Sequence, residues 1–303
     1  MSGACINSRN ERGFTLVELA ISLTIIGLLI GGVLKGMELM DNARATATIA
    51  QVKSYEAAMH TFKDIYNAVP GDMYGASSRI TGCTAGCSPF VSSAGDSRIG
   101  SPVWEDSWAA QGVATTGSTA PSSVSSETYL FWTHLMLANL IGGVTADGIN
   151  NVKNYEWGNT HPAAKIGGGF VVGYAGVSAG GAPGHSGRNC GNGNNNGNGG
   201  NCRSSASGLV GSDTLLVLLP SPAGLVTNTT TSSQQLSPIM AARIDRKMDD
   251  GMPDGGTVLA FGGPSCLNTA TGAYGYDETR TTKDCGLIFS HLGGTGGAGS
   301  TVA

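Results

Sequence analysis

The first strong pattern along the chain is an apolar segment from Phe14 to Leu34 that contains one charged residue, Glu18. A helix needs about 20 apolar residues to cross a bilayer core of roughly 30 Å, so this segment is long enough to span a membrane. A carboxylate inside such a helix is energetically unfavourable, and for that reason Glu18 is a candidate functional residue.

After Lys35 the chain changes from apolar on all sides to apolar on one side. The apolar positions recur every three or four residues, which is the period of a helix with one buried face: Ile49, Val52, Tyr55, Met59, Phe62, Tyr66 and Val69. We therefore predict one continuous helix from Phe14 to Asn67, ending before Pro70. Its first half should be buried in lipid or in a filament core, and its second half should pack against a globular domain.

Shorter patterns predict the remaining elements. Apolar runs indicate four strands, at 170–174, 214–219, 257–261 and 286–290. Two further helices are expected, at 125–141 and at 237–251, the second with Ser237 as its N-cap and Pro238 in its first turn. A long helix followed by strands and short helices predicts an α+β fold, in which the long helix packs on an antiparallel sheet.

Glycine accounts for 48 of the 303 residues, more than twice the usual share of ~7%. We therefore expect long loops, over 71–125 and in the glycine and asparagine tract between Cys190 and Cys202, and a disordered tail from Gly293. Trp104 and Trp108 are expected to anchor the first loop to the domain rather than to form a sugar-binding surface.

Charge and catalytic motifs give little indication of other functions. Charged residues make up 13% of the chain and the formal net charge is −4, which does not favour nucleic-acid binding. No phosphate-binding loop or zinc-protease motif is present in the sequence. We therefore predict that the protein is not an enzyme.

The apolar segment opens with the sequence Arg-Gly-Phe-Thr-Leu-Val-Glu, residues 12–18. This stretch resembles the N-terminus of type IV pilins and type II secretion pseudopilins. The resemblance implies that a prepilin peptidase cleaves between Gly13 and Phe14 and methylates the new N-terminal Phe14. It also implies that Glu18 attracts the free amino group of a neighbouring subunit and sets the stagger of the filament.

The resemblance also implies a domain organisation: a leader peptide at 1–13, a membrane and assembly helix at 14–34, its amphipathic continuation at 35–69, and a globular periplasmic or extracellular domain at 70–303. Arg9 and Arg12 should hold the leader in the cytoplasm. The implied partners are other pilin or pseudopilin subunits in a helical polymer, the prepilin peptidase and an inner-membrane assembly platform. The protein would lie in the bacterial inner membrane and then in a periplasmic or cell-surface filament.

The chain departs from the family pattern at Lys35, where many filament-forming pilins have a proline. Gly31, Gly32 and Gly36 flank this position, and glycine loosens a helix without the fixed kink of proline. The departure leaves open whether the protein is a bulk filament subunit or a minor one. The sequence as a whole does not separate a pilus subunit from a type II secretion pseudopilin, or from a minor pilin that acts as an adhesive or binding module.

The chain has seven cysteines, of which Cys5 lies in the leader. An even number in the exported part predicts disulfides. Proximity in the sequence favours three pairs: Cys83–Cys87, Cys190–Cys202 and Cys266–Cys285. A zinc site is less favoured, because no two cysteines have the spacing Cys-x-x-Cys.

Four aspartates surround the expected end of the helix at 237–251: Asp245, Asp249, Asp250 and Asp254. Negative charge at a helix C-terminus is unfavourable by a few tenths to ~1 kcal/mol, so something should compensate it. One interpretation is a bound Ca²⁺, which takes carboxylate and carbonyl oxygens as ligands; some pseudopilins carry a calcium site in their later loops. The other is that the aspartates cap nearby backbone groups or pair with basic residues of the same helix.

Overall fold

The structure is a computed structural model, and it describes residues 13–83, 87–89, 95, 97, 99, 127–145, 157–174, 214–220, 234–253, 256–262, 266 and 275–292. Its two compact units divide between Arg44 and Ala45. The expectations for Trp104, Trp108, the tract between Cys190 and Cys202, and the tail from Gly293 lie outside the described residues.

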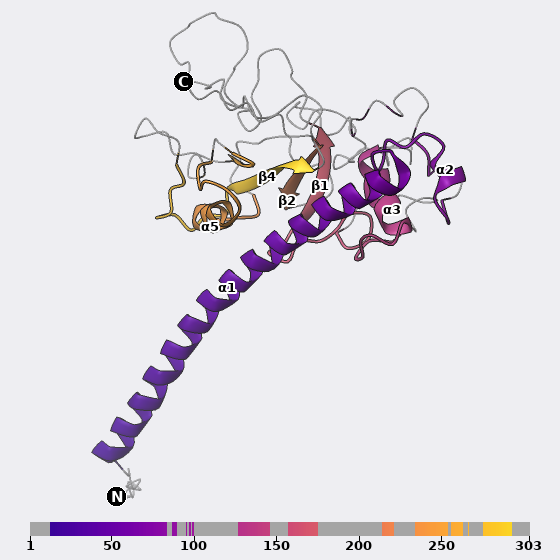
Figure 1. The fold of residues 1–303 in the computed structure, drawn as a ribbon. Coiled ribbons are helices and arrows are strands. Elements are labelled where there is room, and N and C mark those ends of the chain that lie inside the picture. Colours follow the sequence, from indigo (N-terminus) through magenta and orange to yellow (C-terminus); the bar gives the residue numbers. More distant parts are fainter. Residues whose placement is uncertain are drawn as a thin grey trace, which may run out of the picture. The chain divides into compact units, whose positions relative to one another are not determined.

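Helix α1 spans Leu16–Tyr66 (Figure 1). The predicted long helix is thus confirmed, with small differences at its two ends. The helix begins at Leu16 because Thr15 acts as its N-cap, and it ends at Tyr66 because Asn67 adopts a left-handed φ of 48°. Asparagine tolerates this conformation better than most residues, which suits it to the end of a helix.

The strands form one four-stranded antiparallel sheet in the order β1-β2-β4-β3. The strands are β1 (Gly169–Tyr174), β2 (Thr214–Leu219), β3 (Val258–Gly262) and β4 (Cys285–Leu292). All four predicted strands are present, and β4 extends beyond its predicted bounds at both ends. Together with α1 they confirm the predicted α+β class.

One face of the sheet packs against the second half of α1. Val52, Met59 and Phe62 of α1 are buried in the same cluster as Phe170 and Phe289 of the sheet. The ring of Tyr55 meets Phe170 edge-to-face at 5.6 Å between centroids, a geometry that aromatic pairs prefer. The apolar stripe that the sequence predicted is therefore the face of α1 that covers the sheet.

The opposite face of the sheet carries a second, smaller apolar cluster: Val171, Val217, Leu219, Leu259, Phe261 and Ile288. Since successive side chains of a strand point to opposite faces, this cluster alternates with the first one along each strand. Trp157 packs against it, and a Cβ built on Gly169 would lie 2.3 Å from the Trp157 ring. A glycine is therefore needed under that ring.

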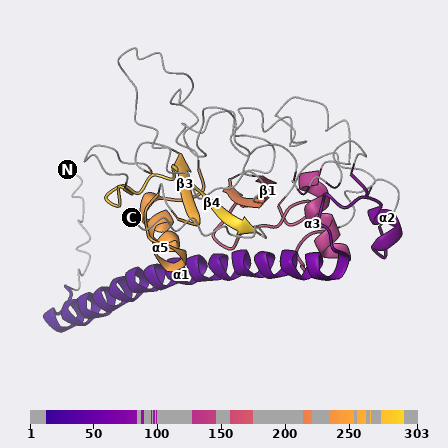
Figure 2. The same ribbon diagram turned by 45° about the horizontal axis from the view of Figure 1, so that its top comes forward.

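Three shorter helices complete the described fold: α2 (Ala76–Arg79), α3 (Glu127–Leu137) and α5 (Pro238–Met248). Figure 2 shows α5 and α3 at opposite ends of the sheet, both beside α1. The same arrangement follows from two contacts. Lys247 of α5 donates to Thr46 of α1 at 3.0 Å, and the ring of His134 of α3 stacks on Phe62.

Two boundaries differ from the prediction. The helix at 125–141 was expected to end at Gly142, but α3 ends at Leu137. Asn139 adopts a φ of 57°, while its N–H and that of Leu140 donate to the carbonyls of Met136 and Leu135. This is a Schellman motif, in which asparagine takes the usual place of glycine. The prediction for 71–125 as loop also missed the short helix α2.

Candidate assembly site and candidate metal centre

The N-terminus of α1 is capped by reciprocal hydrogen bonds between Thr15 and Glu18. The Glu18 carboxylate accepts hydrogen bonds from the Thr15 backbone N–H at 3.1 Å and from its hydroxyl at 3.0 Å. In return, the Thr15 hydroxyl accepts a hydrogen bond from the Glu18 N–H at 3.3 Å. This is a capping box, and its signature Thr-x-x-Glu is a local sequence signal that the hydrophobic pattern alone does not reveal.

The expected cleavage site lies outside the helix. Gly13 and Phe14 precede the first helical residue, Leu16, and both are exposed. A Cβ built on Gly13 would have no neighbour within 4 Å. The peptide bond between Gly13 and Phe14 therefore lies in non-helical backbone, next to the capping box.

Beyond the capping box, α1 exposes a continuous apolar surface. Its large apolar side chains, from Leu16 to Met40, are each at least half exposed. By length and composition this part of α1 could cross a membrane; within the described chain it is the one helix that meets this criterion. Such a surface in a folded chain requires lipid or protein to cover it.

Polar groups within the apolar segment are satisfied by the helix itself. The Ser22 hydroxyl donates to the Glu18 carbonyl at 2.7 Å, and the Thr24 hydroxyl donates to the Ile21 carbonyl at 2.8 Å. At the end of the segment Lys35 pairs with Glu38 at 2.7 Å. Glu18 is the charged side chain of this segment, and its carboxylate is held by the hydrogen bonds from Thr15.

The end of α5 and the residues that follow it, 245–253, form an acidic turn. This turn brings three of the four predicted aspartates together. Ligand oxygens of Asp245, Asp249 and Asp250 all lie within 4.8 Å of one another, while Asp254 lies outside the described residues. The spacing would allow a shared cation, since Ca²⁺ gathers several carboxylate oxygens around itself.

Each of these carboxylates already accepts hydrogen bonds. Asp249 accepts from the N–H groups of Thr257 and Val258 at the start of β3, the second at 3.1 Å. Asp250 accepts from the Met252 N–H at 2.8 Å. The bonds fit the alternative in which the aspartates cap nearby backbone groups. The structure thus shows how the negative charge can be compensated without a metal.

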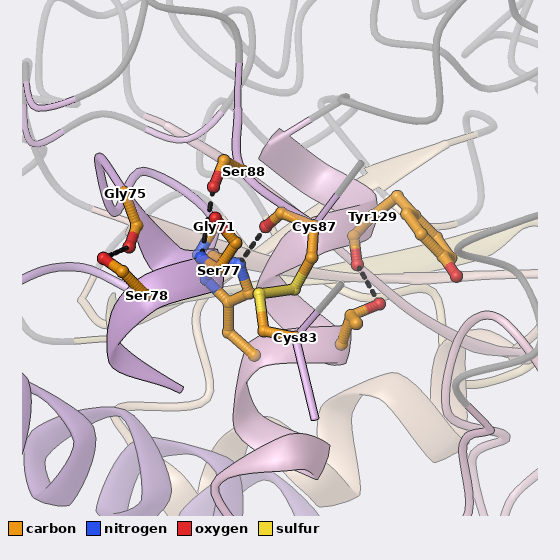
Figure 3. The surroundings of a disulfide bond; sticks show 10 residues. Gly71, Gly75, Ser77, Ser78, Cys83, Cys87, Ser88 and Tyr129 are labelled. Carbon is orange, nitrogen blue, oxygen red and sulfur yellow. Dashed lines mark hydrogen bonds between the residues drawn. A yellow bond between two sulfur atoms is a disulfide. The ribbon is translucent and has the colours of Figure 1, made fainter. Parts of the chain in front are cut away.

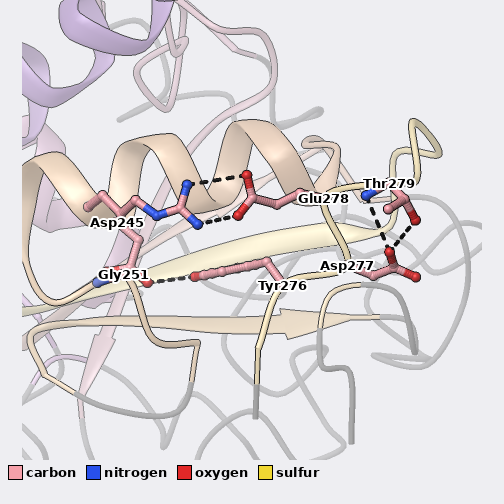
Figure 4. A network of polar contacts seen from close by, with 7 residues as sticks. Asp245, Gly251, Tyr276, Asp277, Glu278 and Thr279 are labelled. Atoms are coloured by element: carbon pink, nitrogen blue, oxygen red, sulfur yellow. Dashed lines mark hydrogen bonds and ion pairs between the residues drawn. The ribbon is translucent and has the colours of Figure 1, made fainter. Parts of the chain in front are cut away.

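Asp245 is the buried member of the acidic turn. It accepts from the Tyr276 hydroxyl at 2.8 Å and from the Gly251 N–H at 3.2 Å, as Figure 4 shows. Burial raises the pKa of Asp245 to about 7, against the opposing effect of these two hydrogen bonds. Burial and the neighbouring Asp245 also raise the pKa of Tyr276 above its ordinary value.

A second contact in Figure 4 holds the same segments together. Arg246 of α5 forms a two-pronged ion pair with Glu278. Because Tyr276 and Glu278 both contact α5, the segment before β4 is fixed to this helix at two points. The sequence predicted the aspartates but not Tyr276 or Glu278, whose partners lie far away along the chain.

The structure contains two of the three disulfides that proximity in the sequence favoured. Cys83 is bonded to Cys87 (Figure 3), and Cys266 is bonded to Cys285 at the start of β4. Cys190 and Cys202 lie outside the described residues. The first disulfide lies beside His134 of α3, whose ring contacts the Cys87 carbonyl.

Comparison with known protein families identifies the start of the chain. The family described as the prokaryotic N-terminal methylation motif matches residues 8–34. Residues 8–34 carry the signal motif of type IV pilins and pseudopilins. The resemblance expected from the sequence is thereby confirmed for these residues, and it includes the expected cleavage site and the capping box.

The motif supports a type IV pilin-like or pseudopilin precursor, a structural type of protein that assembles with other pilin subunits and with membrane machinery. With the long apolar start of α1, it also suggests membrane insertion followed by a place in an extracellular filament. Comparison of the chain with curated proteins and with solved structures gave no match.

Proposed function

We propose that this chain is a structural subunit of a type IV pilus or a related filament, processed by prepilin peptidase after Gly13 and polymerised through α1. The observation that carries the proposal is the motif at residues 8–34, which coincides with an exposed apolar helix that has one carboxylate at its start. A membrane holds this helix before assembly, and neighbouring helices replace the lipid afterwards.

The capping box supports a specific role for Glu18. Before processing, its charge is compensated by the N–H and hydroxyl of Thr15. Cleavage after Gly13 creates a positively charged amine at Phe14, close to the Glu18 of its own chain and available to a neighbouring copy. In a helix bundle without water, an unpaired carboxylate is destabilising by several kcal/mol, so subunits in the wrong register are rejected.

Partners and location follow from this proposal. The subunit would meet prepilin peptidase and an assembly platform at the inner membrane, and then other pilin or pseudopilin subunits in the polymer. Its globular part, which begins after α1, would face the periplasm and later the filament surface. We propose no role in nucleic-acid binding, since the sequence has a low charge density and a net charge of −4.

Lys35 leaves open a second candidate within the same class, a type II secretion pseudopilin or a minor pilin that carries a binding module. The helix is continuous through Lys35, where many filament-forming pilins have a proline. A regular helix at this position suits a short or heteromeric filament as well as a long pilus, and the large loop-rich domain would suit a binding module.

Mass spectrometry of the N-terminal peptide tests the proposal. The protein is recovered separately from the sheared surface fraction and from the membranes of its host. A peptide that starts at methylated Phe14 in the sheared fraction supports the pilus subunit. The same peptide confined to membranes favours the pseudopilin or the minor subunit, whereas a chain that still starts at Met1 contradicts processing and polymerisation.

A further inference from the structure

The imidazole of His134 joins two segments that are far apart along the chain. Its Nδ1 accepts a hydrogen bond from the Gly71 N–H at 2.9 Å, and its Nε2 lies 2.7 Å from the Cys87 carbonyl oxygen. Because Nδ1 is an acceptor, the ring proton is on Nε2, which donates to Cys87. One neutral, fully buried ring therefore connects the turn after α1 with the disulfide segment.

The disulfide fixes one end of this connection. Cys83 and Cys87 are both buried, and their bond closes a short ring in the chain, labelled in Figure 3. The ring constrains the backbone at Cys87, whose carbonyl is the acceptor for His134. Without the bond, Cys87 could move away and leave the buried Nε2–H of His134 without an acceptor, which is energetically unfavourable.

Gly71 forms the other end, in the turn that follows α1. It has a φ of 87°, and a Cβ at this position would lie 2.4 Å from the Glu127 carbonyl and 2.9 Å from the Phe131 N. The backbone of the turn thus lies directly against α3. The neighbouring Asp72 extends the same connection, since its carboxylate accepts from the N–H groups of Gly95 and Ser97.

We propose that the Cys83–Cys87 disulfide is a redox latch that, through His134, fastens the turn at the end of α1 to α3. On oxidation, the two thiols transfer two protons and two electrons to the disulfide of an oxidising partner protein. That partner becomes a dithiol while the bond between the two sulfur atoms of Cys83 and Cys87 forms. The latch lies entirely within the unit that begins at Ala45, and its existence does not depend on the proposed filament role.

Hydrogen exchange of the full-length protein in detergent micelles tests the latch. The disulfide variant Cys83→Ser/Cys87→Ser is compared with the matched control Cys266→Ser/Cys285→Ser. We expect exchange in a peptide covering 68–75 to become about tenfold faster in the first variant and to stay unchanged in the second, with a peptide covering β2 as the internal reference. His134→Ala should produce the same acceleration while the Cys83–Cys87 bond is intact.

Thermodynamic linkage supplies an independent measurement on the protein with its native cysteines. If the disulfide strengthens the His134 contacts, those contacts must stabilise the disulfide by the same factor. The fraction of reduced Cys83 is therefore measured by alkylation and mass spectrometry across a series of glutathione buffers. His134→Ala should make Cys83–Cys87 about tenfold easier to reduce and leave Cys266–Cys285 unchanged.

Three results would overturn the latch. The first is unchanged exchange of the 68–75 peptide when Cys83–Cys87 is removed. The second is equal acceleration of the β2 peptide, which would show a general loss of stability. The third is a reduction equilibrium of Cys83–Cys87 that does not respond to His134→Ala.

Discussion

At the scale of single residues, Glu18 has partners within its own chain, and we propose another partner for it in the filament. Within the chain it is held by the N–H and hydroxyl of Thr15, which fixes its carboxylate beside the first turn of α1. A helix N-terminus also favours a negative charge at this position through the helix dipole. In the filament that we propose, this carboxylate would exchange its contacts with Thr15 for the amine of Phe14 in a neighbouring copy.

Replacing Glu18 by alanine should block filament assembly and leave membrane insertion unchanged. The apolar segment keeps its length, so insertion is expected to be normal, while the partner for the Phe14 amine is lost. Filament yield in the sheared fraction and the amount of subunit in membranes measure the two effects. Glu56→Ala is the control, because it removes a half-buried carboxylate of α1 that pairs with Lys53. Normal incorporation of the Glu18 variant would contradict the proposed role.

Thr15→Val should weaken the start of α1 without removing the charge of Glu18. The substitution removes the hydroxyl, which makes two of the three bonds of the capping box, and loss of an N-cap typically destabilises a helix by about 0.5–2 kcal/mol. We expect faster hydrogen exchange of the amides at 16–19 and reduced, not abolished, filament yield. A yield as low as that of Glu18→Ala would show that Thr15 has a larger role than capping.

Asp249 provides a third test at this scale. Asp249→Ala removes the acceptor for the N–H groups of Thr257 and Val258, and we expect a loss of about 1–3 kcal/mol in the free energy of unfolding. Since the hydrogen bonds require no metal, the loss should be the same in millimolar Ca²⁺ and in a chelator. The calcium site remains a prediction of the sequence. A Ca²⁺-dependent rise in the melting temperature that Asp249→Ala abolishes would support it and contradict our expectation.

At the scale of elements, contacts between segments are set by a few positions where backbones approach closely. Gly71 brings the turn after α1 against α3, and Gly169 lies under the ring of Trp157. Gly286 of β4 lies in the same way under its cross-strand partner Phe261, whose ring would be 2.2 Å from an added Cβ. Such contacts determine the distances between elements, because no side chain can be placed there.

Comparing the stabilities of Gly71→Ala and Gly75→Ala separates the effect of steric crowding from the effect of backbone strain. Both glycines have a left-handed φ, but a Cβ at Gly75 would have its nearest neighbour at 3.6 Å, whereas a Cβ at Gly71 would meet backbone at 2.4 Å. Backbone strain alone should destabilise Gly75→Ala by about 1–2 kcal/mol. Gly71→Ala should lose clearly more, since the turn or α3 must move. Equal melting temperatures of the two variants would contradict the close approach.

At the scale of the whole molecule, buried titratable groups with opposite effects set the pH dependence of stability. Burial lowers the pKa of His134 to about 4 and of His161 to about 3, so both stay neutral in the folded protein while the unfolded chain takes up protons below pH ~6.5. The contribution of these two histidines to the free energy of unfolding is therefore lost as the pH falls from ~6.5 towards 4. Asp245, with a pKa of about 7, binds its proton more tightly in the folded protein, so its contribution is lost as the pH rises from ~4 to 7.

Two variants should therefore change the pH profile in opposite directions. Between pH 4.5 and 6.5, His134→Gln should make the loss of stability on acidification shallower, and Asp245→Asn should make it steeper. Each change should be at most about 1.4 kcal/mol per pH unit, the limit for one proton. Denaturant unfolding in a buffer with chelator measures both slopes. Parallel profiles for wild type and both variants would show that these groups do not titrate as their burial indicates.

Local patterns in the sequence were sufficient for α1, for the strands and for the pilin-type motif, but not for the short helix α2 or the end of α3. Apolar positions at helical spacing predicted α1 and its buried face, and apolar runs predicted all four strands. Residues 12–18 indicated the pilin-type signal, which the family match over residues 8–34 confirms. These features are local, because each depends on residues within a few turns or on one strand. For the same reason Thr15 and Glu18 could have been recognised as a capping box.

Only the tertiary structure decided which distant residues meet. It placed Tyr276 on Asp245 and joined His134 to Gly71 and Cys87, pairs that no spacing in the sequence predicts. The strand order, in which β4 lies between β2 and β3, is likewise absent from the periodicity. The physical reason is that a local pattern records which face of an element is buried, whereas burial alone does not specify the partner. That choice depends on how all the faces pack together in one core.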